Sequence, residues 1–598
     1  MEVAKPIIKI MPDTKDGLMN FKDSLDKSAN SKETNLICNY PTVYIHNWKK
    51  NDKFEVYVGE SNDFFKRTQQ HFDDGNKKDK WQRNIKNNKA SLYVIAHPEF
   101  NKSLTLDVEN RLILYLSSSS SVAKTHNAKG NPQNEYYTCD DLDEIFSKIW
   151  RQLRACNKDL FLSESEIKDS AIYKASPLHK LNEQQLEAKK RIIDNISACL
   201  LKSDEHQLVF VEGDAGTGKT VLMSSIFYDL INKEQYNIEN GSDVVNYKNV
   251  ESAIIVNNKE QLTVYNEIVK KLDLNAKKEK MVFKPTEFIN LFKAKKNSPI
   301  KRRKLYDVVF VDEAHLLLTQ KNQAYIEDDN QLTEIMKYAK VVVAMFDRKQ
   351  IMNAEQYLDE DSINNYIEIA KKNNSFIKLD IQMRMQANKE VTNWIKSIYT
   401  DCKLKEFPRN TGKYDIKVFD TPKQLEKAIR SKAENKETAL SRIVAMYDWD
   451  YSGQSRPKNK EYWDVNIGNW SMPWNYQLSS KLNAKEKRMI KNLAWAEQPH
   501  TINEIGSIYT IHGFDLNYVG VIIGPSVKYC NGKIEFYPSE SHNDKATHKR
   551  TLADGKCKSF GEEFLKNELG VLLTRGVNGL YIYACDPELR KQLKKIVK

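Results

Sequence analysis

The chain has 598 residues, a formal net charge of +12 and a hydrophobic content of 40%, and this length exceeds what one hydrophobic core usually supports. The surplus of Lys and Arg over Asp and Glu favours a polyanionic partner but is too small to establish one. The start of the chain lacks the apolar run of a signal peptide, the longest apolar runs are strand-sized, and the eight cysteines form no C-x-x-C pair. We therefore expect a cytoplasmic protein with several domains, no membrane segment and no zinc knuckle or disulfide framework.

The first 140 residues predict an arm followed by a small α/β domain. Residues 1–35 are polar and rich in lysine, which is typical of a loosely held N-terminal arm. Residues 36–140 contain signals for a β-hairpin, a helix, a strand and a second helix, at Val43–Ile45 and Phe54–Val58, Phe64–Phe72, Ser91–Ala96 and Leu106–Leu116. We expect these elements to form one domain.

The rest of the chain predicts a helical connector and two parallel sheets. Apolar residues recur at helical spacing from Leu142 to Leu162, which places a connector over residues 141–176. Beyond it, short β-rich apolar runs alternate with helical stretches, a pattern that favours parallel sheets with helices on both faces. The length fits one lobe over residues 177–370 and a second, with an aromatic-rich insertion, over residues 371–598. The expected fold class is α/β.

A phosphate-binding loop is the strongest motif. It reads Gly213, Asp214, Ala215, Gly216, Thr217, Gly218, Lys219, Thr220 and fits G-x-x-x-x-G-K-[ST] between an apolar strand and a helix. The glycines let backbone N–H groups point at phosphate oxygens, Lys219 adds a positive charge, and the hydroxyl of Thr220 suits Mg²⁺. The motif predicts that the chain binds ATP with Mg²⁺.

An acidic pair ends a second apolar strand, Tyr306–Val311. Ligands bind at the carboxyl ends of strands in open α/β sheets, so Asp312 is placed to hold the magnesium shell and Glu313 to polarise water. A solvated acidic turn is the alternative, but the upstream phosphate loop favours catalysis.

With these two motifs the chain resembles a superfamily 1 helicase, which implies two RecA-like lobes. In the stretch Leu181–Ala188, Gln185 matches the glutamine that reads adenine. Gln350 matches the sensor of the terminal phosphate, although Phe346 replaces the usual glycine. Arg384 and Arg575 match the two phosphate-facing arginines that couple hydrolysis to lobe movement, while structural salt bridges are the alternative for both.

The segment from Ile508 to Gly520 resembles the schlafen-type helicase branch. Tyr509 stands where that branch usually has histidine, and His512 where it has glutamine. Upstream, the stretch from Tyr447 to Trp474 is rich in aromatic residues. These side chains either stack on bases in a single-strand channel or complete a domain core.

A second group of polar residues occurs in the small N-terminal domain. Arg67 and His71 are four residues apart on the predicted helix, along an edge expected to face the tyrosines of the hairpin. Glu109 has apolar helical neighbours, so its carboxylate projects from an apolar surface. A divalent cation or an arginine would compensate the cost of burying it.

These residues resemble the GIY-YIG endonuclease family from Pro41 to about Gly130. Tyr44 and Tyr57 match the family's two tyrosines, Arg67 its arginine and Glu109 its metal-binding glutamate, whereas Thr42 replaces the first glycine. The match implies one Mg²⁺ or Mn²⁺ at Glu109, a tyrosine that helps to activate water, charge compensation by Arg67 and support from His71, and Asn127 matches a late asparagine. A degraded nuclease retained for binding is the alternative.

Together the motifs predict an ATP-dependent helicase or translocase coupled to a metal-dependent endonuclease. We expect it to act on nucleic acid, on DNA rather than RNA, in anti-phage defence or repair. The alternative is an ATPase switch that senses nucleic acid or a partner and licenses the nuclease without processive unwinding. A scaffold with both sites decayed is disfavoured by the complete motifs, and the sequence leaves a homo-oligomer or a defence-system partner protein open.

Overall fold

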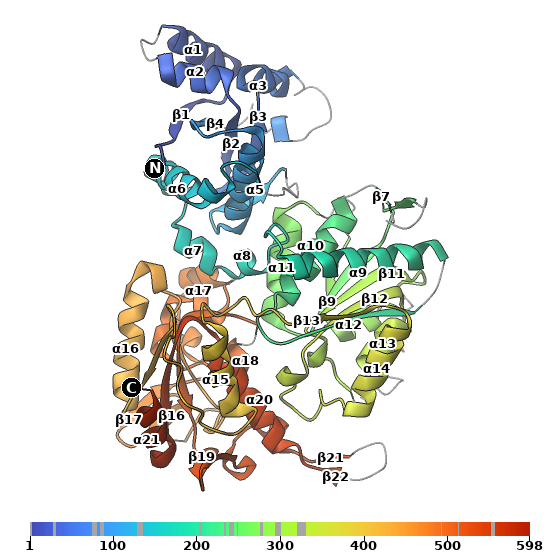
Figure 1. The fold of residues 1–598 in the computed structure, drawn as a ribbon, viewed down its shortest axis with the longest axis vertical. Coiled ribbons are helices and arrows are strands. Elements are labelled where there is room, and N and C mark those ends of the chain that lie inside the picture. The colour runs from blue at the N-terminus through green and yellow to red at the C-terminus, as the bar shows by residue number, and fades with distance from the viewer. Residues whose placement is uncertain are drawn as a thin grey trace. The chain divides into compact units, whose positions relative to one another are not determined.

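The computed structural model describes residues 3–27, 31–73, 81–83, 89–127, 136–202, 206–232, 235–237, 244–247, 249–274, 279–293, 301–319, 330–458, 460–491, 493–511, 513–551 and 557–597. The chain divides into two compact units (Figure 1). The first consists of Met1–Lys180 with Tyr265–Lys280, and the second of Leu181–Val264 with Met281–Lys598.

The first unit is built on a five-stranded sheet of order β1-β4-β2-β3-β5. Strands β2 and β3 form the predicted hairpin, and helix α5 packs against it. The strands are β1 (Ile7–Pro12), β2 (Thr42–Lys50), β3 (Lys53–Ser61), β4 (Ser91–Ala96) and β5 (Val122–Thr125). The helices are α1 (Lys15–Asp26), α2 (Ser31–Asn39), α3 (Phe64–Asp73), α5 (Lys102–Ser118), α6 (Leu142–Cys156), α7 (Glu164–Asp169) and α8 (Ala171–Ala175).

The N-terminal segment differs from the loosely held arm that its composition predicts. Strand β1 pairs antiparallel with β4 from Ile7↔Ala96 to Pro12↔Ser91, so it extends the sheet at one edge. The buried side chains of Leu18 and Leu25 on α1 join the apolar core of the unit. The polar composition reflects an amphipathic helix and an edge strand, in which part of the apolar residues, Ile10 and Met19 among them, stay exposed.

The second unit begins with a six-stranded parallel sheet of order β10-β9-β11-β12-β6-β13. Its central strands are buried on both faces, which explains their continuous apolar sequences. Helices α12, α13 and α14 pack on one face, and α10 packs on the other through Phe227 and Phe310 (Figure 1). The elements are β6 (Gln207–Gly213), β9 (Ser252–Val256), β10 (Val282–Phe283), β11 (Tyr306–Asp312), β12 (Ala339–Phe346), β13 (Phe376–Leu379), α9 (Glu183–Lys202), α10 (Lys219–Asn232), α11 (Lys259–Lys271), α12 (Pro285–Ile289), α13 (Gln331–Met336), α14 (Glu360–Lys372) and the hairpin β7 (Gln235–Asn237) and β8 (Val244–Asn246).

A second parallel sheet, of order β14-β23-β18-β15, completes this unit. Its strands and helices are β14 (Asp415–Val418), β15 (Arg442–Ala445), β18 (Leu516–Ile523), β23 (Gly576–Ala584), α15 (Lys389–Tyr399), α16 (Pro422–Glu434), α17 (Ala484–Ile490), α18 (Ile508–Ile511), α19 (Asp544–Thr547), α20 (Gly561–Leu573) and α21 (Pro587–Ile596). Three hairpins are inserted, β16 (Asp464–Ile467) with β17 (Trp470–Pro473), β19 (Val527–Cys530) with β20 (Lys533–Phe536), and β21 (Arg550–Thr551) with β22 (Cys557–Lys558). The predicted α/β class, a small α/β domain followed by two parallel-sheet lobes, is confirmed.

The aromatic-rich insertion belongs mainly to the core of the second lobe. Trp474 is fully buried and packs with residues of α16 and the sheet. Trp449, Tyr451, Trp463 and Trp470 are partly buried against the same cluster. The packing therefore favours the core interpretation of this stretch over base stacking.

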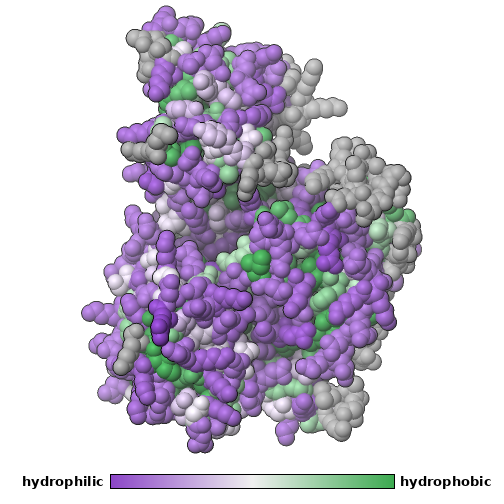
Figure 2. Space-filling view, viewed as in Figure 1, coloured by the Kyte–Doolittle hydropathy of each residue, from purple (hydrophilic) through white to green (hydrophobic). Residues whose placement is uncertain are grey.

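The surface view shows a mainly hydrophilic face with small hydrophobic patches (Figure 2). Among the described residues, no helix combines the length and the apolar character that crossing a membrane requires.

Candidate active sites

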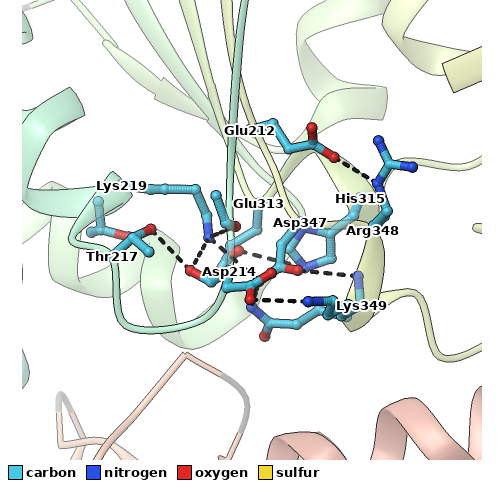
Figure 3. Close-up of polar contacts among 12 residues, drawn as sticks. Glu212, Asp214, Thr217, Lys219, Glu313, His315, Asp347, Arg348 and Lys349 are labelled. Carbon is cyan, nitrogen blue, oxygen red and sulfur yellow. Dashed lines mark hydrogen bonds and ion pairs between the residues drawn. The ribbon is translucent and has the colours of Figure 1, made fainter. Parts of the chain in front are cut away.

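The phosphate loop connects β6 to α10 at the carboxyl edge of the six-stranded sheet. Gly216 and Gly218 have φ values of +82° and +78°, which only glycine adopts without strain. Lys219 is buried, and its Nζ donates to the carbonyl oxygens of Gly213 (2.6 Å) and Asp214 (3.0 Å). The lysine thus lies folded back over its own loop (Figure 3), where a phosphate would compete with these carbonyls.

The acidic pair lies beside this loop. Thr220 donates its hydroxyl to Asp312 Oδ2 at 3.2 Å, so two oxygen ligands of the kind that Mg²⁺ prefers are adjacent. Glu313 adopts φ +50°, a left-handed conformation that is strained for a non-glycine residue and is found most often at functional sites. These residues fit a magnesium ion that keeps several waters and binds the phosphates of a nucleotide.

Glu313 has two close neighbours that the sequence motifs did not indicate. Gln261 on α11 donates from Nε2 to Glu313 Oε1 at 3.5 Å, and Nε2 of His315 lies 3.5 Å from Glu313 Oε2. Burial lowers the pKa of His315, which keeps this imidazole neutral. Gln261 lies in α11, the helix that follows β9, and it belongs to none of the motifs recognised in the sequence.

A charged network links the loop to β12 and to the second lobe. Asp214 pairs with Lys349 at 3.0 Å and with Lys396 of α15 at 2.8 Å. Burial acts to raise the pKa of Asp214, but the hydrogen bonds from Lys396 and Lys349 lower it. Figure 3 shows Lys219, Asp347 and Lys349 around the loop, with Arg348 bound to Glu212 at 2.6 Å nearby.

The predicted adenine-reading glutamine contacts the loop itself. Gln185 is buried, and its Nε2 donates to the carbonyl oxygen of Thr217 at 3.3 Å. Its Oε1 accepts from the backbone N–H of Asn182 at 3.1 Å. Gln185 therefore supports the loop backbone in this structure.

The two predicted arginines come from different parts of the chain and have different contacts. Met383, next to Arg384, donates its backbone N–H to the carbonyl oxygen of Gly216 at 2.8 Å, and Arg384 pairs with Asp515 through a 2.5 Å contact from Nε. Arg575 enters from the second lobe, between α20 and β23, and is 1% exposed.

Gln350 is the link between Arg575 and the first lobe. The guanidinium of Arg575 donates to Gln350 Oε1 at 3.3 Å, and Gln350 Nε2 donates to Asp347 Oδ2 at 2.7 Å. Burial, with the nearby charge of Arg384, lowers the pKa of Arg575 to about 9, so the guanidinium stays charged at neutral pH. The structure thus joins Arg575, Gln350 and Asp347 by hydrogen bonds, and the charges of Arg384 and Glu313 act on Arg575.

One departure from the helicase pattern lies outside this cluster. Tyr509 donates its hydroxyl to Asn543 Oδ1 at 2.9 Å and is 39% exposed. His512 lies outside the described residues.

The polar residues predicted in the N-terminal domain also lie together. Tyr44 and Tyr57, on β2 and β3, have ring centroids 6.5 Å apart, and Tyr44 Oη lies 3.1 Å from Nε2 of His71 on α3. Burial raises the pKa of both tyrosines. The positive charge of Arg67 lowers these pKa values and the negative charge of Glu109 raises them, so Arg67 and Glu109 both lie close to the two tyrosines. Burial, then His46 and Arg67, lowers the pKa of His71 to about 3, which keeps this imidazole neutral.

The single carboxylate of Glu109 fits a divalent cation whose other ligands are water molecules and phosphate oxygens of the substrate. Glu109 is half-buried on α5 beside the tyrosines, and no cluster of three or more His, Cys, Asp or Glu ligands occurs in the part of the chain that the structure describes. One carboxylate with water and phosphate oxygens is a common environment for Mg²⁺. Asn127 supports the strand of Tyr57, because its Oδ1 accepts from Val58 N at 3.0 Å.

Comparison with known proteins identifies both parts of the chain. The model described as Schlafen group 3, DNA/RNA helicase domain matches residues 206–586, and the model described as GIY-YIG catalytic domain matches residues 40–130. The uncharacterized protein YPL245W of Saccharomyces cerevisiae is 31% identical over 470 residues, which cover 74% of this chain and 97% of the yeast protein. Both resemblances drawn from the sequence motifs are confirmed.

Two solved structures of Pif1 helicases are also similar. The Candida albicans Pif1 structure is 12% identical, with a TM-score of 0.27 over 70% of this chain and 99% of that chain. A structure concerned with DNA unwinding at forked dsDNA by two coordinating Pif1 helicases is 10% identical, with a TM-score of 0.23 over 67% of this chain and 92% of that chain. Scores this low are no basis for inferring a function.

Proposed function

The chain belongs to the Schlafen group 3 DNA/RNA helicase family, and from this premise we propose that it is an ATP-dependent helicase or translocase coupled to a metal-dependent endonuclease. We assign the nuclease to residues 36–140, the connector to residues 141–176, the first motor lobe to residues 177–388 and the second to residues 389–598. The boundary lies beyond the predicted residue 370 because β13 pairs with β6 of the first sheet. The observation that carries the proposal is a chain of contacts from the second lobe to the phosphate loop: Arg575 binds Gln350, Gln350 binds Asp347, and Asp347 pairs with Lys219 at 3.4 Å.

In the motor, each residue has a distinct task. Lys219, which contacts the carbonyl oxygens of its own loop, would bind phosphate oxygens of ATP, and Thr220 and Asp312 would hold the Mg²⁺. Magnesium bound there would neutralise phosphate charge. Glu313, beside Gln261 and His315, orients the attacking water.

The arginines complete the cleft. Arg575 stabilises charge that develops on the transferred phosphoryl group, and it does so only while the second lobe is closed on the first. Gln350 links the two lobes, because it contacts Arg575 of the second lobe and Asp347 of the first lobe at the same time.

In the nuclease, Tyr44 and Tyr57 lie beside the neutral imidazole of His71, and the hydrogen bond between Tyr44 Oη and His71 Nε2 holds the hydroxyl of Tyr44 in place. Glu109 holds Mg²⁺ or Mn²⁺, and such an ion would polarise the scissile phosphate. Arg67 compensates the negative charge of the phosphate. We propose DNA as the substrate in preference to RNA, and defence against phage or repair as the role, on the ground that a motor and a nuclease are combined in one chain.

An ATPase switch is a second candidate, and one observation favours it. The two lobes are joined beside the phosphate loop by Arg384–Asp515, Lys396–Asp214 and Arg575–Gln350. A switch would use such contacts to hold the lobes together until nucleic acid or a partner separates them, and would license cleavage without processive unwinding.

One set of assays separates these functions. Wild type, Lys219→Ala and Glu109→Ala are compared for ATP hydrolysis with single-stranded DNA, duplex DNA or RNA, for strand displacement, and for cleavage in Mg²⁺ or Mn²⁺. The helicase proposal requires ATP turnover that is stimulated by a polynucleotide and strand displacement that Lys219→Ala abolishes. Stimulated turnover without displacement supports the switch, and cleavage by Glu109→Ala at the wild-type rate rejects the nuclease assignment.

A further inference from the structure

A buried aspartate–histidine pair lies next to the nuclease tyrosines. Asp13 is 2% exposed and His46 is fully buried, and Nδ1 of His46 lies 2.8 Å from Asp13 Oδ2 and 3.0 Å from Oδ1. Asp13 belongs to the segment that precedes the GIY-YIG match at residues 40–130. This carboxylate is therefore an addition to the family domain, supplied by the N-terminal segment.

The backbone around Asp13 is fixed on both sides. Its N–H donates to the carbonyl oxygen of Ala90 at 3.1 Å, directly after β1 has paired with β4. The next residue, Thr14, is the N-cap of α1 and accepts from Gly17 N at 3.0 Å. The end of β1 and the start of α1 thus hold the carboxylate in one position, beside the start of β4 and in contact with His46 of β2.

His46 is placed among the tyrosines by strand geometry. It is two residues after Tyr44 on β2 and directly opposite Tyr57 on β3, so all three side chains lie on one face of the sheet. Its ring centroid is 5.5 Å from that of Tyr44, 6.0 Å from that of Tyr57 and 5.6 Å from that of His71, and Trp81 closes the cluster at 5.3 Å.

The pair also fixes the tautomer of the imidazole. An ionised carboxylate only accepts hydrogen bonds, so Nδ1 of His46 carries the hydrogen. Nε2 of His46 is closed off from solvent and has no hydrogen-bond partner among the described residues. Leaving a buried polar atom without a hydrogen bond is costly, which indicates that Nε2 bonds a group that arrives with the substrate.

We propose that Asp13 and His46 form a positioning dyad of the nuclease site. Asp13 holds the orientation and tautomer of His46, and the imidazole holds the rings of Tyr44, Tyr57 and His71. Nε2 accepts a hydrogen bond from a water molecule or hydroxyl group of the substrate-bound site. This inference rests on the proposed nuclease function.

The test uses the full chain and the isosteric variant Asp13→Asn. Its amide donates to Nδ1, which moves the hydrogen of the imidazole to Nε2 and reverses that atom's role. The matched control is Glu55→Gln, because Glu55 forms the same kind of pair, with His126 at 2.7 Å, outside the tyrosine cluster. Should Asp13→Asn fail to fold, as judged by thermal melting, His46→Gln takes its place.

We expect kcat for DNA cleavage to fall about 10- to 100-fold in Asp13→Asn, as for other outer-sphere positioning groups. KM for DNA and ATP hydrolysis should stay unchanged, Asp13→Glu should recover part of kcat, and Glu55→Gln should cut at the wild-type rate. ¹⁵N NMR of histidine-labelled wild type should show hydrogen on Nδ1 of His46, and on Nε2 in Asp13→Asn.

The outcomes separate this inference from the function on which it rests. Normal cutting by Asp13→Asn, or hydrogen on Nε2 in the wild type, overturns the dyad and leaves the nuclease assignment in place. Equal losses in Asp13→Asn and Glu55→Gln show a merely structural role and also overturn it. A wild type that cuts no nucleic acid in Mg²⁺ or Mn²⁺ overturns the nuclease and the dyad together.

Discussion

Replacing Arg575 by methionine should abolish ATP turnover while leaving the fold intact. The guanidinium is buried and makes two long hydrogen bonds, of 3.3 Å each, to Gln350 Oε1 and to the carbonyl oxygen of Phe514. Its Nε has no hydrogen-bond partner among the described residues. A charge held this loosely contributes little to folding, because its desolvation offsets what its contacts supply.

The expected magnitudes differ sharply between activity and stability. Loss of a phosphate-facing arginine lowers kcat by about 10³- to 10⁵-fold, which corresponds to about 4–7 kcal/mol of transition-state stabilisation. Methionine fills a similar apolar volume, so the free energy of unfolding should change by no more than about 2 kcal/mol in either direction.

Arg442→Met in the same lobe is the matched control. Arg442 is also buried, but its guanidinium donates four hydrogen bonds, to Thr501 Oγ1 (2.9 Å) and to the carbonyl oxygens of Ala439 (3.1 Å), Ser441 (2.8 Å) and Gln498 (3.2 Å). Removing it leaves buried acceptors unpaired and should cost about 3–5 kcal/mol. Turnover per folded molecule should be unchanged.

Steady-state ATP hydrolysis at saturating ATP and polynucleotide, combined with thermal melting, measures both effects. Wild-type turnover in Arg575→Met would refute the reasoning at once. Melting as low as that of Arg442→Met, with activity lost only in proportion to the unfolded fraction, would show that Arg575 is a structural arginine.

Three further predictions concern other parts of the chain. In Gly59→Ala the new Cβ would lie 2.5 Å from Oη of Tyr44 and would displace this tyrosine. The rate of cleavage should fall by roughly 10²-fold, while ATP hydrolysis should stay unchanged. Cleavage at the wild-type rate would show that Tyr44 needs no fixed position. Burial, then Asp448, raises the pKa of Glu568 to about 8, whereas the unfolded value is about 4.3, so folding takes up a proton and stability falls as pH rises between these values. Glu568→Gln should therefore raise the melting temperature relative to wild type increasingly from about pH 5 to about pH 8, and a pH-independent difference in melting scans would contradict this. EDTA should abolish both cleavage and ATP hydrolysis and Mg²⁺ should restore both, while a metal-independent rate in either assay would exclude that metal site.

The fold was predictable where burial is complete. Strands β6, β11 and β12 are covered on both faces, so their sequences are continuous apolar runs that stand out. Strand β1 was missed because Lys9 and Pro12 interrupt its apolar pattern. Both are tolerated there because the strand lies at the edge of the sheet, where one side of its backbone is unpaired.

The candidate sites were predictable from motif spacing but not from their distant contacts. The phosphate loop and the acidic pair place Lys219 and Glu313 locally, whereas Asp515 and Lys396 reach the loop only through tertiary packing. His46 could have been found, since alternation along β2 puts it on the face of Tyr44. Asp13 could not, because its position depends on β1 pairing with a strand far along the sequence.

Arg384 and Arg575 are attached to different sheets, and this difference should appear in binding and kinetic measurements. Arg384 follows β13, whose ladder with β6 runs to Gly213, and Met383 is hydrogen-bonded to Gly216, so Arg384 is tethered to the phosphate loop itself. Arg575 is carried by the other sheet. If the two sheets separate in the proposed cycle, the Arg384–Asp515 pair would break and Arg575 would withdraw, whereas Arg384 would stay beside the phosphate loop. We therefore expect Arg384 to determine the affinity for both ATP and ADP, and Arg575 to determine only the rate at which bound ATP is hydrolysed.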